Sequence, residues 1–297
     1  MQDAAKSLEE ALRKHVGVFA TDIGPRSPFH GDGLQRAERY IRETLEDAGL
    51  EVTEQPYQYY GQRVANLVAR PPGAARSSTY YVVGAHYDTV LSSPGADDNA
   101  SAVAVMLELA RRLSASGSSA PIRLVAFTLE EPPANMTGQQ GSRVFVEECA
   151  RCRDRVAGAI VLEMVGYTSP RQDYPFVLRW AGYPSQGDFI GIVGNWRSRP
   201  LARAVLKGLR RNKNLPVESL SVPFNGHILP ETRLSDHASF WDAGLPALMV
   251  TDTAFFRNPN YHLPSDTPDT LDFEFMAQLV LSLENAVEEL AWLSSGA

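Results

Sequence analysis

The feature that most constrains this chain is the alternation of short apolar runs with longer amphipathic segments. The apolar runs have the length of buried strands and lie at 80–85, 122–129, 159–164, 189–193 and 247–251. Segments with apolar residues three or four positions apart, as on one face of a helix, separate them. This alternation predicts an α/β fold with a mainly parallel, twisted sheet and helices on both faces.

Four segments carry the helical pattern, and they lie at 7–19, 34–48, 100–113 and 271–293. The first opens with Ser7 and Glu10 at the spacing of a capping box, which predicts a helix that begins at Ser7. Two further extended runs, 51–60 and 65–70, precede the first buried strand. No internal repeat and no linker rich in Pro, Gly or Ser divides the chain. We therefore expect residues 1–297 to form a single domain.

The composition argues against two classes of partner. The chain has a net charge of -7 at pH 7, and its 28 Lys and Arg residues are scattered, which argues against a nucleic-acid-binding surface. No apolar run approaches the ~18 residues of a membrane span, and residues 1–20 do not have the pattern of a leader. We expect a soluble protein, cytoplasmic as the sequence is written, or secreted or periplasmic if a leader has been removed.

The only two cysteines, Cys149 and Cys152, form a single C-x-x-C pair. One pair supplies too few thiolates for a four-cysteine zinc site. It also follows a helical pattern, whereas a redox motif of this type follows a strand. We expect a structural pair, either reduced or bridged.

Polar side chains with metal-binding chemistry stand where three of the apolar runs end. His86 follows the first buried run, Glu130 and Glu131 follow the second, and Glu163 ends the third. Ligands of open α/β sheets collect at the carboxyl ends of the strands. Imidazole nitrogen and carboxylate oxygen are ligands that zinc accepts, and a bridged pair of zinc ions needs about five of them with one carboxylate shared.

The tandem acids Glu130 and Glu131 indicate chemistry as well as binding. Two adjacent carboxylates at the end of an apolar strand repel each other unless a cation lies between them. Successive side chains diverge, so one can bind a metal ion while its neighbour accepts a proton from water. Asp88, two residues beyond His86, is placed to accept from the ring nitrogen that does not bind metal.

The remaining ligands come from loops, where the sequence leaves alternatives open. Asp97 and Asp98 precede a helix, so one acid suits the helix N-terminus and the other a bridging role, and spacing does not say which. His262 lies in a proline-rich loop beside Tyr261, whose hydroxyl suits a developing oxyanion. His237, which is preceded by Asp236, is a competing ligand with an equally good structural explanation.

Six motifs in the same order resemble the M28 family of zinc aminopeptidases, which have a zinc-exopeptidase fold. They are His86-Tyr-Asp88, Gly95-Ala-Asp-Asp98-Asn-Ala-Ser, Glu130-Glu131, Leu162-Glu163-Met-Val-Gly166, Ser235-Asp-His237 and Tyr261-His262-x-x-x-Asp266-Thr. The resemblance implies a two-zinc metallopeptidase that removes the amino-terminal residue from a peptide with a free amino terminus.

The resemblance also assigns roles to the candidate residues. Asp98 bridges both zinc ions, His86 and Glu163 complete one site, and Glu131 and His262 complete the other. Glu130 is the general base and Tyr261 donates a hydrogen bond to the transition state. Asp88 and Asp236 support the ligands from behind, and the peptide bond after Asp98 is cis. The resemblance does not imply which amino-terminal residue is preferred or which oligomeric state the protein has.

Two departures from the family pattern bear on the metal and the substrate. Glu163 stands where the family usually has aspartate, so one zinc is an alternative to two. Residues 132–138 replace the usual glycine-leucine turn after Glu131, so that wall of the site differs. The alternative function is a single-zinc glutaminyl cyclase, a transferase of the same fold, although that class has tryptophan where this chain has Tyr261. A binding protein on an inactive peptidase fold is a third class, and the presence of all five ligands argues against it.

Overall fold

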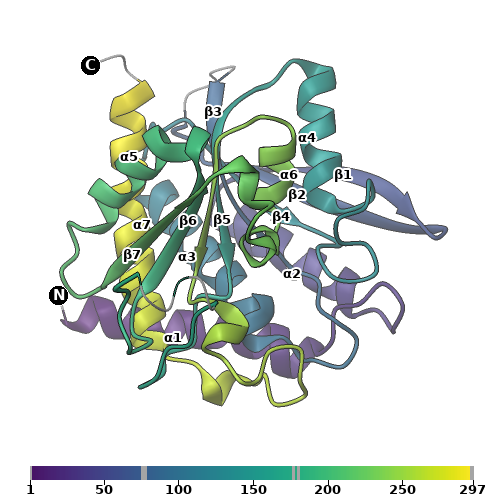
Figure 1. The fold of residues 1–297 in the computed structure, drawn as a ribbon. Helices are drawn as coiled ribbons and strands as arrows, with labels where there is room; N and C mark the ends of the chain where they lie inside the picture. The colour runs from purple at the N-terminus through teal and green to yellow at the C-terminus, as the bar shows by residue number, and fades with distance from the viewer. Residues whose placement is uncertain (1, 75–78, 176–177, 179–180, 295–297) are drawn as a thin grey trace.

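The computed structural model describes residues 2–74, 79–175, 178 and 181–294. They form one eight-stranded sheet flanked by helices (Figure 1). The strands are β1 (Glu51–Tyr59), β2 (Gln62–Arg70), β3 (Thr79–His86), β4 (Ile122–Phe127), β5 (Arg155–Glu163), β6 (Ile190–Asn195), β7 (Val217–Val222) and β8 (Ala247–Thr251). The α-helices are α1 (Gln2–Gly17), α2 (Gly33–Asp47), α3 (Ala102–Ala115), α4 (Gly141–Cys152), α5 (Arg199–Leu209), α6 (His237–Asp242) and α7 (Phe273–Ser294).

The strand order is β1-β2-β4-β3-β5-β8-β6-β7. Strands β4, β3, β5 and β8 are parallel neighbours, as are β6 and β7, whereas β1 with β2, β2 with β4, and β6 with β8 are antiparallel pairs. Within the parallel part His86 lies opposite Phe127, and Glu163 lies opposite Thr251. The carboxyl ends of β3, β4, β5 and β8 therefore meet at one edge of the sheet, which is where the candidate site lies.

Apolar cores lie on both faces of the sheet, because successive side chains of a strand point to opposite faces. In β4, Leu124 and Ala126 join the core under α1, α3 and α7, while Val125 and Phe127 join the core under α4 and α6. The aromatic ring of Phe127 packs edge-on against Phe145 of α4 and Phe240 of α6. The predicted α/β fold with helices on both faces is confirmed.

Several local predictions need correction. The first helix begins at Gln2 rather than at Ser7, so Ser7 lies inside the helix and caps nothing. Strand β7 was not predicted, because it lies at the edge of the sheet and its burial is mixed. The sequence indicated a helical segment before Cys149, but it did not give the bounds of α4, α5 or α6.

The cysteines lie on α4 with free thiols, Cys149 buried and Cys152 exposed. The two cysteines therefore form no disulfide, and Cys149 Sγ lies 3.5 Å from the hydroxyl oxygen of Tyr80 in β3. Among the described residues, no helix has both the length and the apolar character needed to cross a bilayer.

Candidate metal centre

Two groups of potential metal ligands lie at the carboxyl ends of the central strands, and they share one residue. His86, Asp98 and Glu163 form the first group, and Asp98, Glu131 and His262 form the second. His86 and Glu163 end strands β3 and β5, Glu131 follows β4, and Asp98 and His262 come from the loops after β3 and β8. The structure thus brings together all five residues that the sequence singled out as ligands.

The spacing of the ligand atoms fits a metal ion in each group. Four ligands at about 2.0–2.1 Å from one zinc ion are roughly 3.3 Å apart at tetrahedral angles. His86 Nε2 lies 3.4 Å from Asp98 Oδ1 and 3.4 Å from Glu163 Oε2. His262 Nε2 lies 3.2 Å from Asp98 Oδ2 and 3.2 Å from Glu131 Oε2. Each oxygen of Asp98 therefore belongs to a different group.

Three of the atoms that could bind a metal ion here have no hydrogen-bond partner. Nε2 of His86, Nε2 of His262 and Oε1 of Glu131 are buried and unpaired. The other ring nitrogen of His86, Nδ1, lies 3.2 Å from the backbone carbonyl oxygen of Asp88. A proton on Nδ1 would donate to that carbonyl and leave the lone pair of Nε2 free for a metal ion.

The electrostatics of the centre call for a cation. Burial and the Asp98 carboxylate raise the pKa of Glu131 to about 8. Burial opposes protonation of His262, yet Asp98 and Glu131 raise its pKa to about 10. Burial opposes protonation of His86 as well, yet Glu163, Asp88 and Asp98 raise its pKa well above the ordinary value. Without a metal ion His86, His262 and Glu131 hold protons that they would not hold in water at neutral pH, and a divalent cation would replace these protons.

The structure distinguishes Asp98 from Asp97, which spacing alone did not. Asp97 points away from the two groups, where its carboxylate accepts from the backbone N–H of Gly166 at 2.9 Å and from Asn258 Nδ2 at 2.7 Å. The peptide bond after Asp98 is cis, as the family resemblance implied. The Asn99 side chain then binds both the carbonyl of Leu162 and the N–H of Met164, on either side of Glu163.

Asp88 supports the site in a way that differs in detail from the expectation. Its carboxylate oxygens accept from the backbone N–H groups of Glu130 and Glu131, each at 3.0 Å. Its backbone carbonyl oxygen is closer to His86 Nδ1 than its carboxylate, which lies 3.5 Å away. One residue thus orients both the imidazole ring and the tandem acids.

Asp236 and His237 lie outside both ligand groups. Asp236 is fully buried and accepts from Gln140 Nε2 at 3.1 Å, and burial raises its pKa to about 7. His237 Nε2 lies 2.8 Å from the carbonyl oxygen of Thr232, and its ring packs edge-on against Trp241. His237 therefore has the structural role that the sequence left open.

Three supporting residues were not assigned a role from the sequence. Ser235 Oγ donates to Glu163 Oε2 at 2.6 Å, and the Asp266 carboxylate accepts from the backbone N–H groups of Asp97 and Asp98 at 2.8 and 3.1 Å. Both residues lie in the quoted motifs, so the motifs were the available signal. Arg26 had none, because it stands in a proline-rich loop far from them in sequence.

Arg26 is fully buried beneath the loop that carries Asp98. Its guanidinium donates to the backbone carbonyls of Tyr87, Pro94 and Gly95 at 2.8, 2.7 and 2.8 Å. Burial lowers its pKa to about 10, although nearby carboxylates, Asp266 first among them, oppose this. Arg26 is thus a buried positive charge that joins the start of the loop after β3, at Tyr87, to its end, at Pro94 and Gly95.

Glu130 and Tyr261 line the same pocket as the ligands but belong to neither ligand group. Glu130 Oε2 lies 4.0 Å from His86 Nε2. The Tyr261 ring stacks on the His262 ring, with centroids 3.8 Å apart and planes at 20°. Residues 132–136, where the sequence departs from the family pattern, supply part of the pocket wall through Pro132, Asn135 and Met136.

Two other proteins are similar to this chain in sequence over most of its length. The chain is 38% identical over 283 residues to the uncharacterized protein YfbL of Escherichia coli strain K12, covering 91% of this chain and 85% of that protein. It is 25% identical over 300 residues to leucine aminopeptidase 1 of Metarhizium robertsii, covering 93% of this chain and 70% of that protein.

Two solved structures share the fold. The LapA aminopeptidase of Legionella pneumophila superposes with a TM-score of 0.71 at 22% identity, covering 98% of this chain and 74% of that chain. A glutaminyl cyclase of Porphyromonas gingivalis superposes with a TM-score of 0.68 at 18% identity, covering 95% and 98%. Residues 66–284, which include all five candidate ligands, match the model of peptidase family M28, so the chain belongs to this family.

Proposed function

We propose that the chain is a two-zinc aminopeptidase, which hydrolyses the peptide bond after the amino-terminal residue of a peptide. The observation that carries this proposal is the pair of ligand groups that share Asp98, with two buried imidazole nitrogens left unpaired. His86, Asp98 and Glu163 would hold one ion, and Asp98, Glu131 and His262 the other. When bound, zinc polarises a carbonyl group and makes a coordinated water more acidic.

Glu130 is the general base of this proposal. Burial raises its pKa well above the ordinary value, with the Glu163 and Glu131 carboxylates adding to the effect and His86 opposing it. A carboxylate with a raised pKa binds a proton more firmly, which suits a group that accepts a proton from the attacking water. The protonated Glu130 then donates that proton to the leaving amine.

Tyr261 stabilises the negative charge that develops on the carbonyl oxygen. Burial and the nearby carboxylates, first Asp98 and Glu131, raise the pKa of Tyr261, so its hydroxyl keeps its proton and remains a donor. Its stacking on His262 fixes the ring beside the second ligand group. A positioned donor of this kind acts where charge appears in the transition state.

The test is the substitution Glu130→Gln, which keeps the size of the side chain and removes its basicity. We expect the zinc content to stay near that of the wild type and turnover of aminoacyl anilides to fall by about 10² or more. Glu147→Gln, an exposed glutamate on α4, is the matched control and should leave both unchanged. Full activity of Glu130→Gln would contradict the assigned base.

Glutaminyl cyclase activity is the second candidate, because a solved cyclase matches nearly the whole chain in fold. A cyclase would need only the group of Asp98, Glu131 and His262 around a single zinc. The completeness of the group of His86, Asp98 and Glu163 favours the peptidase. A glutaminyl peptide separates the two, since a peptidase releases glutamine and a cyclase converts the amino-terminal glutamine to a ring without releasing an amino acid.

A further inference from the structure

A large apolar pocket adjoins the metal centre. Glu163, Leu234 and Tyr261 line both the pocket around the ligands and this second pocket, whose empty volume is about 880 Å³. Strands β8, β6 and β7 form its floor, and its aromatic walls come from loop residues, namely Tyr174, Tyr183, Phe189, Phe255 and Phe256. Concave sites with a mainly apolar lining hold small molecules or side chains.

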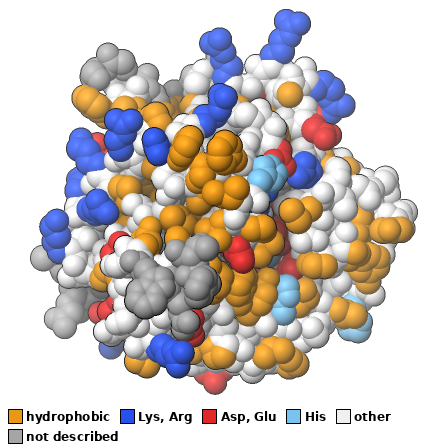
Figure 2. Space-filling view, in the orientation of Figure 1, with side chains coloured by type: hydrophobic (Ala, Val, Ile, Leu, Met, Phe, Trp, Pro, Cys, Tyr) orange, Lys and Arg blue, Asp and Glu red, His pale blue; other side chains and the backbone are white. Residues whose placement is uncertain are grey.

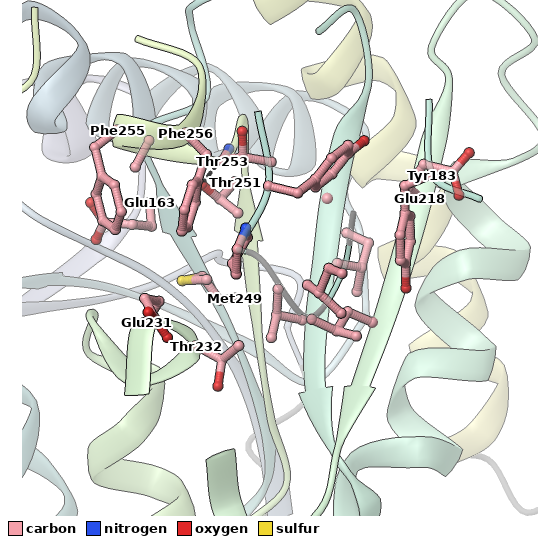
Figure 3. A pocket seen from close by; sticks show the side chains of 18 of the residues that line it. Glu163, Tyr183, Glu218, Glu231, Thr232, Met249, Thr251, Thr253, Phe255 and Phe256 are labelled. Carbon is pink, nitrogen blue, oxygen red and sulfur yellow. Dashed lines mark hydrogen bonds between the residues drawn. The ribbon is translucent and has the colours of Figure 1, made fainter. Parts of the chain in front are cut away.

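The pocket crosses the sheet from the metal centre towards the edge strand. Met249 of β8, Ile192 of β6 and Leu220 of β7 contribute to it in turn. Figure 3 shows Glu163 at one end and Glu218 with Tyr183 at the other. With strands about 4.8 Å apart, the path from β5 to β7 is roughly 14 Å long. That length accommodates a long side chain that enters beside the metal ligands.

The charged side chains among the described residues of the lining have one sign. Its described residues include four carboxylates, those of Glu163, Asp173, Glu218 and Glu231, and neither lysine nor arginine. Figure 2 shows hydrophobic side chains gathered in the middle of this face and most Lys and Arg around its margin. A low-dielectric pocket lined by one sign of charge attracts ligands of the other sign.

Glu231 is the carboxylate in this pocket that most clearly lacks a partner. One of its oxygens, Oε2, is buried and accepts no hydrogen bond, and no ion pair joins Glu231 to any residue that the structure describes. By contrast, Asp173 pairs with Arg171, and Glu163 accepts from Ser235. Glu231 as a whole is half-buried, so its other oxygen still meets water, but a cationic ligand would give the buried Oε2 the partner that it lacks.

The position of Glu231 determines which part of a substrate it meets. Glu231 lines the apolar pocket but not the pocket around the metal ligands. In Figure 3 it lies near Met249, at the end of the apolar pocket closer to Glu163. A substrate whose scissile bond lies at the metal centre would therefore present its first side chain to Glu231, not its backbone.

We infer that this pocket selects peptides whose amino-terminal residue is lysine or arginine, with Glu231 binding the positively charged end. The inference rests on the proposed aminopeptidase function. The apolar walls contact the methylene stem, and the carboxylate pairs with the charge. Norleucine has a stem of similar length without the charged group, so it would cover the carboxylate without pairing it, which is unfavourable.

The first measurement compares matched substrates on the zinc-loaded protein. We expect kcat/KM for lysyl and arginyl anilides to exceed that for norleucyl and leucyl anilides by about 10- to 100-fold, the usual range for a hydrogen bond to a charged group. Glu231→Gln should abolish this preference by lowering kcat/KM for the lysyl and arginyl anilides, whereas kcat/KM for the norleucyl anilide should not fall. Equal or greater hydrolysis of the norleucyl substrate by the wild type would overturn the inference while leaving the aminopeptidase proposal intact.

A control variant tests the assignment within the pocket. Glu218→Gln changes the carboxylate at the far end, and the preference for lysine should survive it. If Glu218→Gln removes the preference and Glu231→Gln does not, the assignment to Glu231 is wrong. Melting temperatures of both variants should stay near that of the wild type, which confirms that each is folded.

A binding measurement separates this inference from the proposed function. Lysine amide and norleucine amide are titrated calorimetrically into wild type and Glu231→Gln, which requires no turnover. Tighter binding of lysine amide to the wild type alone would support the pocket assignment even if no anilide were hydrolysed. Equal affinity of the wild type for the two amides would overturn it even if leucyl anilide were hydrolysed.

Discussion

The metal centre and the apolar pocket adjoin at Glu163 and Tyr261, yet they are built in opposite ways. In the centre, carboxylates hold backbone N–H groups, as Asp88 does for Glu130 and Glu131. In the pocket, mainly apolar and aromatic side chains of β6, β7, β8 and two loops form the walls. The centre is thus fixed through its backbone, whereas the pocket can change its preference by exchanging single side chains.

This difference separates the chemistry from the selection of substrate. Asn99 and Ser101 also bind backbone groups of residues 162–165 around Glu163, so the loop after β3 and the end of β5 are joined at several points. A substitution there should alter metal content first. A substitution in the pocket should alter substrate preference while the metal content stays constant.

The largest expected effect is that of Asp98→Asn. An amide presents one oxygen and no charge, so it cannot bridge two ions as a carboxylate does. We expect the zinc content to fall below that of the wild type and turnover to fall by roughly 10³-fold or more, since the metal supplies several kcal/mol of transition-state stabilisation. Zinc analysis and anilide hydrolysis measure these two effects.

Asp269→Asn is the control for this change, because Asp269 is an exposed acid in the loop that carries His262. It should keep both zinc content and activity. Unchanged zinc content in Asp98→Asn would contradict the bridging role and would weaken the contrast between a fixed centre and an adaptable pocket.

Removal of the metal should make the stability of the protein sensitive to pH. His262, with its pKa raised to about 10, stabilises the folded state fully below its ordinary pKa of 6.5, and this contribution is lost as pH rises through about 10. The pKa of Glu131 is raised from 4.5 to about 8, so its protonated form is the one that the folded state favours. The free energy of unfolding therefore falls as pH rises from 4.5 through about 8. Both effects therefore have the same sign.

We expect the melting temperature of the metal-free protein to fall between roughly pH 6.5 and pH 8.5, and the zinc-loaded protein to fall less over the same interval. The reason is that the metal ion, once bound, takes the place of the protons on these groups. Thermal unfolding at several pH values, with and without zinc, measures the difference. Parallel curves would show that the centre contributes no proton-linked stability.

The sequence predicted the centre better than it predicted the pocket, and the structures of the two regions explain why. His86 and Glu163 end buried apolar strands, and that position can be recognised from the local sequence. The family resemblance added Asp98 and His262, whose loops carry no such signal. Neither the strand ends nor the family resemblance pointed to Arg26, because it contacts backbone carbonyls, which every residue has.

The pocket depends on contacts between segments that are far apart in sequence. Glu231 lies in a short turn between β7 and α6, and nothing in its neighbours indicates that it faces Met249 of β8. Strand β7 itself was missed, since an edge strand with mixed burial lacks a continuous apolar run. Tertiary packing decides these features, so the pattern of the sequence alone could not locate the pocket.

The smallest expected effect tests the pocket side of the comparison. Met249 is buried in the pocket wall, and Met249→Leu nearly conserves volume, so we expect a loss of stability below about 1.5 kcal/mol. Substrate preference should shift by about tenfold or less, because a small change of shape in an apolar pocket discriminates weakly. Zinc content should not change, since Met249 contacts the pocket and belongs to neither ligand group.

Met106→Leu in the core of α3 is the matched control, because it makes the same chemical change at a fully buried position that does not line the pocket. Both variants should lose a similar amount of stability, measured by urea unfolding, but only Met249→Leu should change the ratio of kcat/KM between lysyl and leucyl anilides. A similar shift in both variants would mean that preference follows general stability. A loss of zinc in Met249→Leu would mean that the pocket and the centre are not independent. The substitution in the pocket wall would then have displaced Glu163, which lines both.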